Sequence, residues 1–125
     1  MTSKQWLTIV GIFPFLNGAA ALLVPNAFMS PFGVETDLGG ILGLRYFGDS
    51  TLGLAVILWL ARNLVDWDAL RSVHVGGFVT FALALVVGAS ATISGVINAL
   101  GWVNAAIDVV IVIGFAHFLF LKKAA

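Results

Sequence analysis

Four long runs of predominantly apolar residues fill most of this chain, at 6–24, 39–61, 71–90 and 98–121. A helix that crosses the hydrocarbon core of a bilayer needs about 20 such residues. In lipid every backbone polar group needs a partner, and a helix supplies those partners within its own segment. Runs such as 107–115 lack the alternation of apolar and polar residues that a membrane barrel requires. The pattern predicts an all-α integral membrane protein.

The composition indicates that lipid surrounds this chain. Of its 125 residues 61% are hydrophobic and 10% are charged, and the mean hydropathy is +1.09. A soluble domain has about 25% charged residues. A soluble chain this short would not have enough interior to bury so much apolar surface. The formal net charge is zero, which gives no indication of a nucleic-acid partner, and the lack of cysteine excludes disulfides and thiolate metal sites.

Short connections separate the four runs, so we expect a single domain over residues 1–125, folded as an up-down four-helix bundle. Pro25 and Pro31 interrupt the chain after the first run. The segment 25–37 also contains Phe28, Met29 and Phe32. Their side chains either lie in lipid along the membrane surface or cover the outer end of the bundle.

Basic residues near the ends of the runs predict the orientation. They fall on one side of the expected bundle, at Lys4, Arg62, Arg71, Lys122 and Lys123, whereas the first and third connections contain no Lys or Arg. Because cytoplasmic segments carry an excess of Lys and Arg, we expect both termini to be cytoplasmic.

The charged pair Arg45 and Asp49 lies deep within the second run. Charged side chains at this depth are costly, and they are rare outside functional or pairing sites. Their four-residue spacing places both on one face of a helix. Asn104 and Asp108 have the same spacing in the fourth run.

Polar residues of three helices are predicted to lie at a similar depth, because a helix rises about 1.5 Å per residue. We expect them to turn inward, so that Arg45 contacts both Asp49 and Asp108. Asp108 is then the protonatable member, since Asp49 has Arg45 as its local partner. The candidates for a ligand or proton site are Arg45, Asp49, Asp108, Asn17, Asn104 and Tyr46. A purely structural interpretation remains open, since a buried ion pair can fix helix register without chemistry. The same residues could instead contact a membrane helix of another protein.

Other features carry less chemical information. His74 and His117 are predicted to lie near the headgroups as ordinary interfacial residues, and their spacing gives no metal or cofactor motif. No metal and no cofactor is therefore predicted, although a lipophilic ligand is compatible with the pattern. A stripe of small residues runs along the third helix at Gly76, Thr80, Ala84 and Gly88. It predicts close packing, either within the bundle or across a homodimer.

The layout resembles small four-span bacterial inner-membrane proteins of unknown function. The resemblance rests on chain length, on the proline- and phenylalanine-containing loop that ends at Phe32-Gly33, and on the sequence Arg45-Tyr46-Phe47-Gly48 in the second run. It implies a location in the bacterial inner membrane and no particular activity.

Three functions are compatible with these features. The leading interpretation is a non-enzymatic membrane protein that binds a lipophilic ligand or serves as an accessory subunit of a membrane complex. The second is a proton- or ion-coupled small transporter that works as an oligomer. The third is an intramembrane enzyme of the isomerase or cyclase type on a lipid-like substrate, with an Asp as general acid and Arg45 stabilising developing negative charge.

Overall fold

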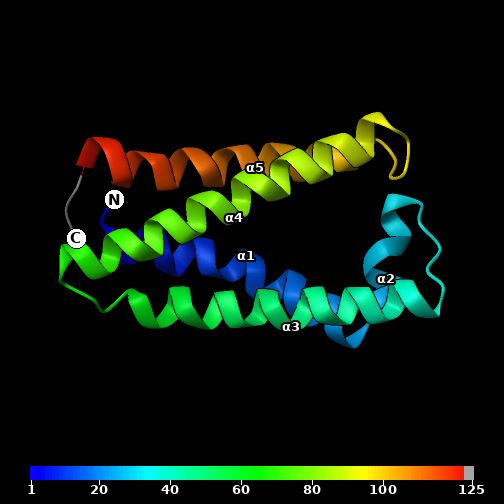
Figure 1. Ribbon diagram of the computed structural model, residues 1–125, viewed down its shortest axis with the longest axis horizontal. Coiled ribbons are helices and arrows are strands. Elements are labelled where there is room, and N and C mark those ends of the chain that lie inside the picture. Colours follow the sequence, from blue (N-terminus) through cyan, green and yellow to red (C-terminus); the bar gives the residue numbers. More distant parts are fainter. Residues whose placement is uncertain (123–125) are drawn as a thin grey trace.

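The computed structural model describes residues 1–122 and shows them to be helical, with no strand in that part of the chain (Figure 1). The elements in chain order are α1 (Ser3–Leu23), α2 (Pro25–Met29), η1 (Ser30–Phe32), α3 (Leu38–Ala61), α4 (Trp67–Ile93), α5 (Gly101–Ala116) and the π-helical η2 (His117–Lys122), which continues α5. Four helices, α1, α3, α4 and α5 with η2, are long and apolar enough to cross a membrane. This finding indicates a membrane protein. Lys123, which the orientation prediction uses, lies outside the described residues.

Local signals explain where the long helices begin. Thr2 caps α1 in a capping box, in which its hydroxyl accepts a hydrogen bond from the Gln5 backbone N–H while the Gln5 side chain accepts from the Thr2 N–H. Asp37 and Asp66 cap α3 and α4 by accepting hydrogen bonds from backbone N–H groups within the first turn. α4 extends beyond the predicted range 71–90 at both ends, and Asp66 accounts for its earlier start.

The long helices form two closely packed pairs, α1 with α3 and α4 with α5, and successive helices run in opposite directions (Figure 1). Gly18 and Gly48 are the point of closest approach between α1 and α3. A Cβ atom built on Gly48 would lie 2.7 Å from the carbonyl oxygen of Gly18, and one built on Gly18 would lie 2.9 Å from that of Gly48. In lipid, glycine at such positions lets two backbones pack directly.

At one end, which we call the termini end, aromatic side chains join the two pairs. The rings of Trp6 and Phe115 meet edge to face at 5.5 Å, and Trp6 also stacks near Phe118. Leu7 and Leu58 are fully buried in the same cluster. Lys122 Nζ donates a hydrogen bond to the Met1 carbonyl, so both ends of the described chain lie here.

At the opposite end, the loop end, a short helical segment covers the bundle. This cap consists of α2 and η1, residues 25–32, and ends at Gly33 in the left-handed conformation (φ 76°). The Asn98 side chain donates a hydrogen bond to the Pro31 carbonyl and its backbone N–H donates to the Phe32 carbonyl, both at 2.9 Å. The cap is thereby held against the connection between α4 and α5. The cap aromatics cover the bundle end, which was one of the two predicted arrangements.

Candidate ligand pocket between the helix pairs

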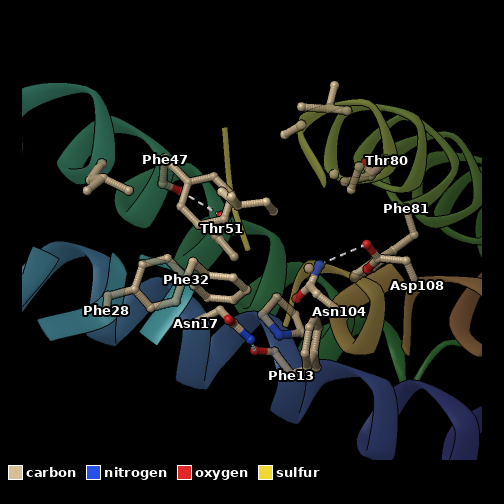
Figure 2. Close-up of a pocket in the computed structure, with 18 of the residues that line it drawn as sticks. Phe13, Asn17, Phe28, Phe32, Phe47, Thr51, Thr80, Phe81, Asn104 and Asp108 are labelled. Carbon is tan, nitrogen blue, oxygen red and sulfur yellow. Dashed lines mark hydrogen bonds between the residues drawn. The ribbon is translucent and has the colours of Figure 1, made fainter. Parts of the chain in front are cut away.

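A pocket of about 370 Å³ lies in the loop-end half, between the two helix pairs and beneath the cap. Its wall is mostly aromatic and aliphatic, and Figure 2 shows the rings of Phe13, Phe28, Phe32, Phe47 and Phe81 around it. Phe81 also stacks on Phe115 with a centroid distance of 6.1 Å. Phe81 therefore separates the pocket from the aromatic core at the termini end.

Asp108 is the dominant polar group of the pocket. It comes from α5, its residue is 1% exposed, and its Oδ2 accepts a hydrogen bond of 3.1 Å from Asn104 Nδ2 one helical turn away (Figure 2). Among residues 1–122 no cation lies within ion-pair distance of it. A carboxyl in an apolar pocket with one amide partner retains unused acceptor capacity, because a carboxylate has about four lone-pair sites.

The other three long helices supply further polar groups to the wall. Asn17 of α1 uses its side-chain N–H to donate to the Phe13 carbonyl at 2.8 Å, and Thr51 of α3 donates to the Phe47 carbonyl at 2.6 Å. Thr80 of α4 also lines the pocket. Together with Asp108 of α5, polar residues from all four long helices line the pocket.

Of the six predicted site residues, the structure brings Asn17, Asn104 and Asp108 together in this pocket. The predicted buried ion pair is wrong, since no ion pair is found in the described part of the chain and Arg45 and Asp49 are both exposed. Tyr46 is 63% exposed and therefore does not pack in the bundle core. The cause is the rotation of α3. Gly48 packs against α1 and the pocket-lining residues Phe47 and Thr51 face the other helix pair, so Arg45 and Asp49 lie on the remaining, outward side of the helix.

Several pocket residues were not predicted as a site. The small-residue stripe of α4 contributes Thr80, Ala84 and Gly88 to the wall, and Gly76 and Gly88 have no atom within 4 Å of a built Cβ. Within the described chain no helix therefore packs closely on the stripe at Gly76 or Gly88, and a homodimer contact there stays a prediction. The sequence contained one feature that could have predicted this wall: the small residues of α4 lie at the same depth as Asn104 and Asp108 of α5.

His74 is also placed differently from the prediction. It is fully buried in the aromatic core at the termini end, a contact that the sequence did not predict, and its Nε2 lies 2.8 Å from Ser3 Oγ. The imidazole stacks on Phe118 at 5.2 Å, and its Nδ1 has no partner among the described residues. His117 is exposed. Within residues 1–122 no group of three or more His, Asp or Glu side chains could hold a metal ion.

Comparisons with known proteins add no relative: no protein family, no curated protein and no solved structure matches this chain. The proposed function is therefore inferred from the chemistry of the pocket.

Proposed function

We propose that this protein is a four-span membrane protein that binds a lipophilic molecule with one hydrogen-bonding end in the pocket between its helix pairs. The observation that carries the proposal is Asp108, a buried carboxyl that faces an apolar cavity without a cationic partner in the described chain. In a membrane protein a buried ionisable group is expected to have a pairing or functional role. Its internal partner Asn104 satisfies it only in part.

The dimensions and lining of the pocket support a small ligand. Pockets that bind small molecules have volumes of about 300–1,000 Å³ and combine apolar walls with a few placed polar groups. This pocket is about 370 Å³, with aromatic walls and polar atoms near Asp108. The apolar body of the ligand lies between the Phe rings and the cap. Its polar end is a hydroxyl, amide or amine that donates to Asp108 or accepts from the Asn104 amide.

The proposed setting is the bacterial inner membrane, with both termini on the cytoplasmic side. Three basic residues lie at the termini end, where Met1 meets Lys122. They are Lys4 near the start of α1, Arg62 just after α3 and Arg71 near the start of α4. The positive-inside rule assigns that end to the cytoplasm. The pocket and its cap then lie in the outer half of the bilayer.

Binding can be tested on the protein purified in detergent. The two probes are tritiated 1-dodecanol and tritiated dodecane, which differ only in the polar end. We expect saturable binding of dodecanol that exceeds that of dodecane. Asp108→Leu should weaken dodecanol binding about 10-fold or more, because a hydrogen bond to a charged group contributes about 1.5–3 kcal/mol. Ala84→Phe should block both probes by filling the pocket.

Asp49→Asn is the matched control, since this exposed carboxyl lies on α3 away from the pocket lining. It should bind both probes as the unaltered protein does. Equal binding of the two probes, or unchanged binding in both Asp108→Leu and Ala84→Phe, would contradict the proposal. Native mass spectrometry of the purified protein provides a second measurement. We expect a small lipophilic molecule to copurify with the protein, and we expect Ala84→Phe to reduce the number of these molecules bound per chain.

A second candidate function, an intramembrane isomerase or cyclase, is favoured by the position of Asp108 beside a cavity of ligand size. Asp108 would act as the general acid, a role that requires it to lie within hydrogen-bond distance of the reacting atom. Arg45 does not reach this pocket and supplies no charge stabilisation there. Chemical identification of the copurified molecule before and after incubation distinguishes a binding protein from an enzyme. A binding protein leaves the molecule chemically unchanged, whereas an enzyme converts it.

A further inference from the structure

The face of α3 that points away from the bundle carries a charged pair with no use in the pocket. Arg45 and Asp49 are exposed there, next to Tyr46. Asp49 lies at the middle of α3, twelve residues from its end at Ala61. At about 1.5 Å per residue it is more than about 15 Å from either end of the helix. Its short side chain cannot reach an aqueous boundary from this depth.

Contacts within the chain do not satisfy this pair. Asp49 accepts a hydrogen bond of 3.0 Å from Ser50, its neighbour in sequence. Arg45 has no hydrogen-bond or ion-pair partner among residues 1–122. In a bilayer both groups would face lipid tails, where charged side chains are costly and are expected to pair.

We propose that a second copy of this chain covers this face, with Arg45 of each copy paired with Asp49 of the other. A two-fold axis along the membrane normal places the two α3 helices side by side in the same direction, and each then presents the same patch. The patch is self-complementary, because it holds one cation and one anion a single helical turn apart. The long Arg side chain spans that offset, and its planar group suits a carboxylate.

Gly53 permits the close approach that this arrangement needs. It lies one turn beyond Asp49, is exposed, and has no atom within 4 Å of a built Cβ. Small residues at such positions allow membrane helices to pack closely. A second copy is favoured over a different partner because this one face already supplies both members of the ion pair in equal number. The pocket residues of α3 lie on the opposite side, so the dimer contact is independent of ligand binding.

Charge exchange between copies tests the pairing directly. R45E makes both charges of the patch negative and D49K makes both positive. Each variant alone should dimerise at least about 30-fold more weakly than the unaltered protein, since a buried pair left unpaired is strongly unfavourable. R45E mixed with D49K should form heterodimers, because the opposite charges again face each other. R45E/D49K in one chain should restore the homodimer. Dimerisation is measured by single-molecule photobleaching in liposomes.

Cysteine crosslinking locates the interface, and the chain has no native cysteine to interfere. G53C and L42C, on the outer face of α3, should crosslink to dimers under oxidation. V86C, on an exposed position of α4, is the matched control and should remain monomeric. Retained dodecanol binding in R45E shows that this variant is folded. A monomeric unaltered protein, R45E or D49K dimers as strong as the unaltered ones, or a failed rescue in the R45E and D49K mixture would each overturn the proposal.

Discussion

The two halves of the bundle are built from the same four helices but differ in what fills the space between the helix pairs. At the termini end Phe115 of α5 and Phe118 of η2 meet Trp6 of α1 and His74 of α4. At the loop end of the same helices, the pocket wall includes small residues of α4 such as Ala84 and Gly88. The residues that α5 contributes there include Gly101 and Asn104. The cap covers the space that these side chains leave open.

This difference teaches that large aromatic side chains accompany the packed half, whereas small side chains of α4 accompany the pocket half. Lipid is as apolar as the bundle interior, so helices associate through close packing and hydrogen bonds. The termini end supplies both, with its aromatic cluster and the buried contact between Ser3 and His74. The loop end has less packing and contains the pocket that Asp108 lines. The predictions below test this division, beginning with the largest expected effect.

Removing an aromatic ring should affect stability only in the packed half. Phe115 is 0% exposed and Phe47, which lines the pocket, is 48% exposed. We expect Phe115→Ala to lower the free energy of unfolding by about 3 kcal/mol, because it leaves a cavity that its neighbours cannot fill. Phe47→Ala should cost less than about 1 kcal/mol, since it only enlarges an existing pocket. Unfolding by sodium dodecyl sulfate in mixed micelles measures both, and equal losses would remove the distinction between the halves.

A methyl group at the closest helix approach should disturb both halves together. Gly48 packs against the Gly18 backbone near the middle of the α1–α3 pair, whereas Gly76 of α4 has open space around it. Gly48→Ala should lower the free energy of unfolding by about 2 kcal/mol through overpacking. It should also weaken dodecanol binding, because α1 and α3 form one wall of the pocket. Gly76→Ala, the control, should be neutral or stabilising by up to about 1 kcal/mol. Stability loss without any change in binding would show that the pocket does not depend on the spacing of this pair.

Length and hydropathy were sufficient to predict the four long helices. Each apolar run is close to or above the length that a bilayer requires. In the structure Asp37 and Asp66 cap the starts of α3 and α4. The depth argument placed Asn17, Asn104 and Asp108 at a similar level, because depth depends only on residue number along a helix, and all three line one pocket. The orientation of the bundle and the identity of the membrane stay predictions.

The rotation of each helix about its axis could not be predicted in the same way. A membrane helix is apolar on all sides, so hydropathy does not identify its buried face. We expected Arg45 and Asp49 to turn inward because of their charge, whereas the glycine contact at Gly48 determines the buried face of α3. His74 illustrates the reverse case: a polar residue near a helix end is buried because Ser3 and Phe118 are placed against it. Both outcomes depend on contacts between segments distant in sequence.

The smallest expected effect concerns the cap, which belongs to the pocket half alone. Asn98→Ala removes the hydrogen bond that the side chain donates to the Pro31 carbonyl and the one that it accepts from the Leu100 backbone N–H, and keeps the backbone bond to Phe32. A hydrogen bond of this kind contributes about 1 kcal/mol, so we expect dodecanol to dissociate roughly 5-fold faster while the free energy of unfolding changes by less than about 1 kcal/mol. Stopped-flow displacement by excess unlabelled dodecanol measures the rate.

Ser94→Ala is the matched control for the cap, because this exposed hydroxyl lies near the same connection but bonds only to carbonyls of its own helix. It should leave the dissociation rate unchanged. If Asn98→Ala destabilised the protein as strongly as Phe115→Ala, the cap would be part of the packed structure. If it left dissociation unaltered, the ligand would not leave past the cap, and the gap between α3 and α4, which make few contacts with each other, would be the route to test next.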